Sequence, residues 1–153
     1  MRHDKLLFDL DGTISDPLTG IARCINHALH HAGYRTYTEA ELGPFVGPPL
    51  DQTFQAITGS SDQNEIRALV EKYRERYADI GYAENQLYQD MDIVIARLYE
   101  AGTVMAVCTF KPQVYAEKIL ELFDLRQYFR FVSGGDIGIR KWQQIAELKA
   151  LGL

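Results

Sequence analysis

Two carboxylates one residue apart, Asp9 and Asp11, are the side chains of this sequence best suited to chemistry. They follow the apolar residues 6–8 and precede a turn formed by Gly12 and Thr13, which are assigned to phosphate binding. An unpaired ionised carboxylate is costly away from water, so two acids at the end of a buried strand indicate a cation, a phosphate site, or both. A hard divalent cation such as Mg2+ would stabilise both ionised oxygens. The alternative is an ordinary Asp-Gly turn capped by Asp9.

A second polar group follows the apolar strand predicted at residues 103–108. The hydroxyl of Thr109 and the backbone N–H groups at the start of a helix form a cradle for phosphate oxygens. Phe110 and Lys111 complete this turn and are assigned to the same phosphate site. In the alternative interpretation, Thr109 only caps the helix and Lys111 is a solvated lysine.

Lys141 begins the last predicted helix, after the glycine-rich turn at residues 134–138. A lysine there would neutralise phosphate charge and keep a nucleophilic carboxylate ionised. A lone lysine on an amphipathic helix is more often simply solvated. The three polar groups, however, follow successive strands, and ligands bind at the carboxyl ends of strands in open parallel sheets. Their coincidence favours one shared site.

The predicted elements define an α/β fold. Strands at residues 5–9, 103–108 and 130–133 alternate with helices, which is typical of a Rossmann-like parallel sheet, here incomplete with about three strands. Residues 17–82 contain no convincing strand and are predicted to form an inserted all-helical cap. The core then comprises residues 1–16 and 83–153.

Composition limits the functions to consider. The 153 residues carry 16 basic and 21 acidic side chains, a net charge of -5, and no basic stripe, so a nucleic-acid partner is not expected. No apolar run approaches the roughly 18 residues of a membrane span, and no signal peptide is expected before the first strand. Cys24 and Cys108 lie far apart and are predicted to be reduced, buried thiols. The expected location is cytoplasmic.

The motifs resemble those of the haloacid-dehalogenase-like hydrolase superfamily, in particular its phosphoglycolate-phosphatase-like branch with a helical cap. FDLDGT at residues 8–13 is similar to the first motif, DxDGT. TFKP, which begins at Thr109, resembles the T-(S/N)-K-P of that branch, and Lys141 resembles the lysine of the third motif. FVGPPL at residues 45–50 resembles a segment of the cap. The resemblance covers essentially the whole chain.

This resemblance implies a Mg2+-dependent phosphatase for a small phosphorylated metabolite such as phosphoglycolate. Asp9 would attack phosphorus and form an aspartyl-phosphate, and Asp11 would protonate the leaving alcohol and then activate water. Mg2+, held by Asp9 and Asp11, would spread the transition-state charge together with Thr109 and Lys141.

The chain departs from the pattern in three places. The turn before Lys141 is a few residues shorter than in many relatives. Phe110 stands where the branch has Asn or Ser, and the chain ends at Leu153, before the acidic motif that completes the metal shell in the superfamily. The sequence therefore predicts a truncated, impaired enzyme whose first strand lies at an exposed sheet edge, with homodimerisation through that edge as a consequence. Two alternatives stay open: a non-catalytic truncated member of the superfamily, and a sugar phosphomutase of the same fold.

Overall fold

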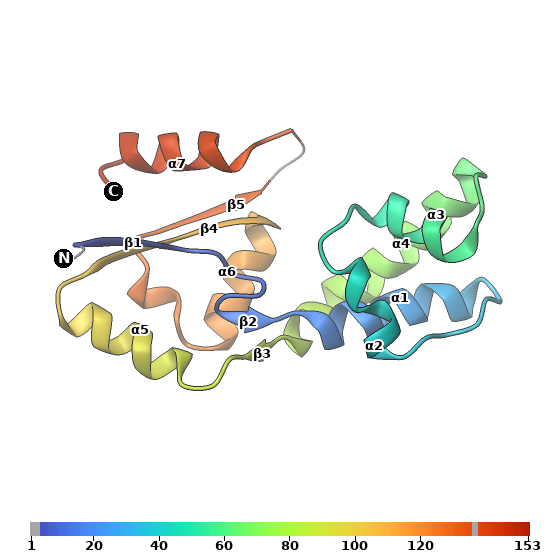
Figure 1. The fold of residues 1–153 in the computed structure, drawn as a ribbon, viewed down its shortest axis with the longest axis horizontal. Coiled ribbons are helices and arrows are strands. Elements are labelled where there is room, and N and C mark those ends of the chain that lie inside the picture. Colours follow the sequence, from blue (N-terminus) through green and yellow to red (C-terminus); the bar gives the residue numbers. More distant parts are fainter. Residues whose placement is uncertain (1–3, 136–137) are drawn as a thin grey trace. The chain divides into compact units, whose positions relative to one another are not determined.

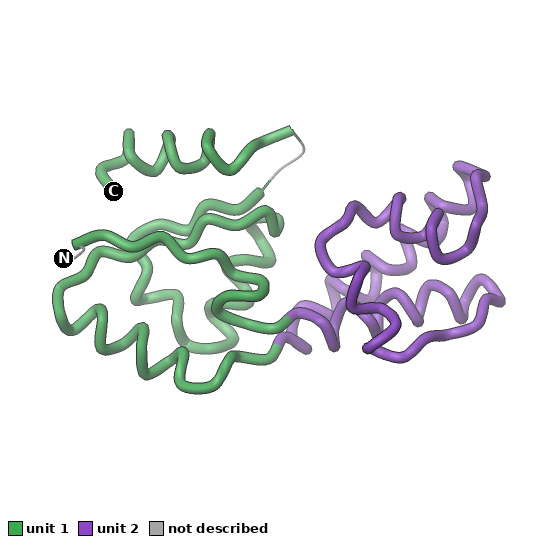
Figure 2. The backbone as a smooth tube through the Cα atoms, in the orientation of Figure 1, with its two compact units in different colours: residues 1–16, 86–153 green, residues 17–85 purple. Residues whose placement is uncertain are grey.

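The structure, a computed structural model, describes residues 4–135 and 138–153. The chain divides into two compact units, coloured separately in Figure 2. Unit 1 comprises Met1–Asp16 and Gln86–Leu153, and unit 2 comprises Pro17–Asn85. The boundary expected at residue 82 lies within the short helix η2 (Gly81–Glu84), just ahead of the point where unit 2 ends.

Unit 1 is built on a three-stranded parallel sheet in the order β1-β4-β5 (Figure 1). The strands are β1 (Lys5–Phe8), β4 (Val104–Pro112) and β5 (Phe131–Gly135). Figure 1 shows helix α7 on one face of this sheet and helices α5 and α6 on the other. Their bounds are Met91–Glu100 for α5, Gln113–Leu122 for α6 and Lys141–Ala150 for α7, with η3 (Arg126–Tyr128) between α6 and β5. The α/β architecture predicted from the alternation of strands and helices is confirmed.

Strand β1 is half exposed, and the prediction of a buried strand is wrong in this respect. β1 pairs with β4 alone among the described residues, so its other edge carries no neighbour. Leu7 in its middle is 41% exposed. The apolar run had indicated a strand with both faces covered, whereas the exposed sheet edge, which was also predicted, is confirmed.

Two further corrections concern strand lengths. β4 was expected to end at Cys108, but it continues to Pro112, with a register shift between these two residues. The short antiparallel pair of β2 (Ser15–Asp16) and β3 (Gln86–Leu87) was not predicted. Strands of two residues are too short to show the alternation of apolar and polar residues from which strands are recognised.

Unit 2 is helical, with α1 (Leu18–His31), α2 (Glu39–Leu42), α3 (Leu50–Thr58) and α4 (Gln63–Asp79) as its α-helices. The short helix η1 (Gly43–Phe45) follows α2. The core of unit 2 includes Phe54, whose ring forms a T-shaped pair with that of Tyr73, with the two centroids 6.5 Å apart. Buried aromatic pairs of this kind hold α3 against α4.

Both cysteines are buried and free, as predicted. Within the described ranges, every helix is too short or too polar to cross a bilayer.

Candidate active site

The loop after β1 holds Asp9 at the carboxyl end of the strand. The carbonyl of Leu10 accepts hydrogen bonds from three later N–H groups of the loop, those of Thr13, Ile14 and Ser15, and Gly12 has a φ of 79°. A residue other than glycine rarely adopts this left-handed conformation, so the turn depends on Gly12. The loop therefore turns sharply directly after Asp9, whose Oδ1 accepts a 2.8 Å hydrogen bond from the N–H of Leu10.

Gly12 and Thr13 were assigned to phosphate binding. Both are exposed, but their N–H groups are used within the turn: that of Gly12 donates to the carbonyl of Ser15 and that of Thr13 to the carbonyl of Leu10. The two residues thus shape the loop. Their contact with phosphate remains a prediction.

Lys141 lies beside Asp9. Its Nζ is 2.7 Å from Asp9 Oδ2, which makes an ion pair between the first residue of α7 and the end of β1. The same Nζ lies 5.2 Å from the ring centroid of Phe110, within the range of a cation–π contact. Lys141 and Asp9, predicted to share a site, are therefore in direct contact. The contact of the Phe110 ring with this lysine was not foreseen, since only the backbone of Phe110 had been considered.

Lys111 pairs with Asp11, at 3.1 Å between Nζ and Oδ2. Only 7% of the lysine side chain is exposed, so the alternative of a solvated loop lysine is wrong. Burial raises the pKa of Asp11 above its ordinary value, Lys111 opposes this shift, and the neighbouring charge of Asp9 adds to it. Asp11 thus retains its proton to higher pH than an ordinary aspartic acid.

Thr109 is buried on β4, two positions beyond Val107, which pairs with Phe8 of β1. Strand register therefore brings Thr109 to the same end of the sheet as Asp9. Its Oγ1 accepts a 3.1 Å hydrogen bond from the N–H of Lys111, and its carbonyl accepts one of 2.9 Å from Gln144. The helix-cap alternative is wrong, because α6 begins only at Gln113. The role of Thr109 toward phosphate remains a prediction.

The carboxylates of Asp9 and Asp11 fit a hard cation. Asp11 Oδ1 is a buried oxygen without a hydrogen-bond donor, which is the state of an oxygen suited to a metal ion. Mg2+ is commonly held by one or two carboxylates together with water and substrate phosphate. The described part of the chain contains no cluster of three or more His, Cys, Asp and Glu side chains. These two acids are therefore the protein ligands that it offers at this end of the sheet.

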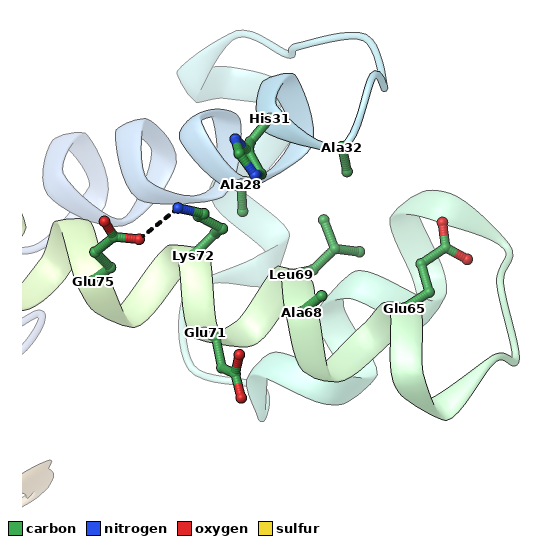
Figure 3. A pocket seen from close by; sticks show the side chains of 9 residues that line it. All are labelled: Ala28, His31, Ala32, Glu65, Ala68, Leu69, Glu71, Lys72 and Glu75. Atoms are coloured by element: carbon green, nitrogen blue, oxygen red, sulfur yellow. Dashed lines mark hydrogen bonds and ion pairs between the residues drawn. The ribbon is translucent and has the colours of Figure 1, made fainter.

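A cavity of about 300 Å³ in unit 2 is a poorer place for an anion (Figure 3). It has an apolar floor that includes Leu69 and a rim of three glutamates, and Lys72 at this rim is paired with Glu75 at 2.9 Å. The full lining is Ala28, His31, Ala32, Glu65, Ala68, Leu69, Glu71, Lys72 and Glu75. Its negative charge repels phosphate. The carboxyl end of the sheet therefore remains the candidate phosphate site.

Comparison with known proteins defines the class. The haloacid dehalogenase-like hydrolase family matches residues 6–141, and the chain belongs to this family. It is 34% identical over 137 residues to a 5'-nucleotidase of Pseudomonas aeruginosa, covering 90% of this chain and 62% of that protein. It is 33% identical over 138 residues to a phosphoglycolate phosphatase of Vibrio parahaemolyticus, covering 86% of this chain and 60% of that protein. The chain thus spans about three-fifths of the length of these relatives.

A solved structure gives the same result for the fold. A protein from Clostridium difficile, described as a phosphatase candidate, superposes with a TM-score of 0.92 at 36% identity, over 99% of this chain and 71% of that one. The predicted membership in the haloacid-dehalogenase-like hydrolases, with phosphoglycolate phosphatases among the relatives, is confirmed. The α/β fold of that family is confirmed as well.

Proposed function

We propose that this chain carries the catalytic residues of a cytoplasmic, Mg2+-dependent phosphatase that hydrolyses a small phosphate monoester through an aspartyl-phosphate. The observation that carries the proposal is the ion pair between Lys141 and Asp9 at the carboxyl end of β1. Two residues after Asp9 lies Asp11, whose pKa is raised by burial. The proposal assigns the roles of nucleophile, proton donor and phosphate-binding cation to Asp9, Asp11 and Lys141 in that order.

In the first step an oxygen of Asp9 attacks phosphorus, and the bond from phosphorus to the ester oxygen breaks. The proton of the Asp11 carboxyl passes to the leaving oxygen, which departs as the neutral alcohol. The raised pKa of Asp11 supports this role, since the carboxyl retains its proton closer to neutral pH than an ordinary aspartic acid. The product of this step is the phosphoryl ester of Asp9.

In the second step water attacks the phosphorus of the aspartyl-phosphate and gives its proton to the carboxylate of Asp11. The bond from phosphorus to Asp9 breaks, inorganic phosphate leaves, and both side chains return to their starting forms. Lys141 lies beside the nucleophile and would neutralise phosphoryl charge in both steps.

Asp9 and Asp11 would hold Mg2+ when it is bound, and the ion would supply further neutralisation of charge on the phosphoryl oxygens. Because the described residues offer two carboxylates and no larger ligand cluster, we expect weak retention of the ion and slow turnover.

Hydrolysis of phosphoglycolate and of p-nitrophenyl phosphate by the purified chain, with Mg2+ present, tests the proposal. Asp9→Asn should abolish hydrolysis, because an amide oxygen does not replace the carboxylate nucleophile. Asp4→Asn is the matched control, the same substitution at the opposite, exposed end of β1. Hydrolysis by Asp9→Asn at the rate of the unmodified chain, or no hydrolysis by the unmodified chain, would contradict the proposal.

A further inference from the structure

A buried amide on α7 connects this helix, which carries Lys141, to β4, which carries Thr109, and to the neighbouring strand β5. Gln144 is 1% exposed and lies three positions after Lys141, so the two side chains share one side of the helix. Lys141 forms the ion pair with Asp9. The interactions that fix the Gln144 side chain therefore also determine the position of Lys141.

The Nε2 of Gln144 faces oxygen atoms from the ends of two strands. It lies 2.9 Å from the carbonyl oxygen of Thr109 on β4 and 3.0 Å from that of Gly134 on β5. The carbonyl and hydroxyl oxygens of Ser133 follow at 3.2 and 3.3 Å. An amide nitrogen has two hydrogens to donate, so the two shortest contacts can be satisfied together. One side chain thus links α7 to both β4 and β5.

The packing of α7 alone does not account for a glutamine here. Leu148, one turn further along, already packs in a core cluster with Ala106 and Cys108. In contrast, the Oε1 of Gln144 is buried without a donor, an arrangement that costs stability. A buried polar group kept at such a cost calls for an explanation, and two of the three elements that it joins carry Thr109 and Lys141.

We propose that Gln144 is a positioning residue, which holds α7 against the ends of β4 and β5 so that Lys141 Nζ reaches Asp9 and Thr109 keeps its orientation. This inference rests on the proposed function. The hydrogen bonds of Gln144 go to β4 and β5, so it acts on the site through the backbone of Thr109 and through the helix that carries Lys141.

The test is a double-mutant cycle between residues 144 and 141, measured on the hydrolysis of p-nitrophenyl phosphate by the full chain. Gln144→Met keeps the length of the side chain and removes the amide, and Gln144→Leu is the second variant. Displacement of a catalytic group by about 1 Å can cost up to two orders of magnitude in rate, so we expect kcat/KM to fall at least about tenfold. In a Lys141→Met background the same change should lower kcat/KM by a clearly smaller factor, because the lysine that it positions is gone and only its effect on Thr109 remains.

Leu148→Ala is the matched control for stability. It weakens the packing of the same helix but touches none of the carbonyls that Gln144 holds. Its effect on kcat/KM should be the same with and without Lys141. An equal effect of Gln144→Met in both backgrounds, or no effect in either, would overturn the inference and leave the proposed function standing.

Binding of inorganic phosphate, measured by titration calorimetry, keeps the inference separate from the proposed function. If the unmodified chain binds phosphate but turns over no ester, the dissociation constant replaces kcat/KM in the same cycle, with the same expected dependence on Lys141. Absence of hydrolysis by the unmodified chain contradicts the proposed function in either case, and a chain that also binds no phosphate overturns the positioning role as well.

Discussion

Lys141 Nζ and Asp9 Oδ2 lie 2.7 Å apart, although the two residues are 132 positions apart in the chain. The contact joins the first residue of α7 to the residue that follows β1. A phosphoryl group attacked by Asp9 would therefore meet an ammonium already in place. Groups that need no rearrangement when charge develops are the ones that stabilise a transition state most effectively.

Lys141→Met should lower kcat/KM for phosphate esters by about two to three orders of magnitude, the cost of removing one group that stabilises developing negative charge. Steady-state kinetics with Mg2+ in excess measure this loss. Lys149→Met removes the same charge from an exposed position of the same helix and should leave kcat/KM unchanged. Equal kinetics for the two variants would argue against a role for Lys141 in the reaction.

Lys111→Met should shift the pH profile toward alkaline values. Burial raises the pKa of Asp11 and Lys111 opposes this rise, so loss of the ammonium raises the pKa further. Asp11 must be protonated to release an alcohol, and kcat/KM for phosphoglycolate therefore falls as pH rises through this pKa. We expect that fall at higher pH in the variant than in the unmodified chain. If kcat/KM of the variant falls at the same pH as that of the unmodified chain, or at a lower pH, Asp11 is not the proton donor.

Gly135→Ala should destabilise unit 1 by about 2 kcal/mol or more, as expected for overpacking in a close contact. A Cβ on Gly135 would lie 2.2 Å from the carbonyl oxygen of Phe110, so β4 and β5 would have to separate next to Thr109. Denaturation in urea measures the change in the free energy of unfolding. Gly43→Ala is the control: apart from its chain neighbours and the backbone of its own helix, no atom lies within 4 Å of its Cβ position, and its φ is -48°. A stability of Gly135→Ala that matches this control would refute the close contact.

Glu84→Gln should destabilise unit 2 by about 1–3 kcal/mol at neutral pH, the usual cost of depriving a largely buried charged group, here Arg76, of its partner. Glu84 Oε1 lies 2.6 Å from Nη1 of Arg76, and its Oε2 lies 2.5 Å from Nη1 of Arg23, while its own side chain is 10% exposed. Burial by itself raises the pKa of Glu84, but the hydrogen bonds from the two arginines outweigh it and place the pKa below the ordinary 4.5.

The pH dependence of this effect has a defined sign. A carboxyl whose pKa is lowered on folding contributes stability that is present above its unfolded pKa, about 4.5, and lost as pH falls through the folded value. The difference in unfolding free energy between Glu84→Gln and the unmodified chain should therefore shrink as pH falls below about 4.5. Glu71→Gln, at an exposed position of α4, should show no such dependence. If the difference in unfolding free energy between Glu84→Gln and the unmodified chain persists at acidic pH, the destabilisation does not arise from loss of the ionised carboxylate.

Local patterns in the sequence were sufficient for the class of fold and for most members of the candidate site. The alternation of apolar strands with helices predicted the parallel sheet, and the start of the last helix at Lys141 was also predicted. Such features depend on neighbours within a few positions along the chain. The half-exposed state of β1 and the two-residue strands β2 and β3 depend on neighbours distant in sequence, and they were misjudged or missed.

The pairing of charges was decided by the tertiary structure alone. From the sequence, Lys111 and Lys141 are two cations that could each serve Asp9 or Asp11, and Gln144 is one polar residue among many on a helix. In the folded chain Lys141 forms an ion pair with Asp9, and Lys111 forms one with Asp11. Gln144 donates a hydrogen bond to the carbonyl of Thr109 on β4. Electrostatic and hydrogen-bond energies depend on distance in space, and these distances exist only once β1, β4, β5 and α7 are packed together.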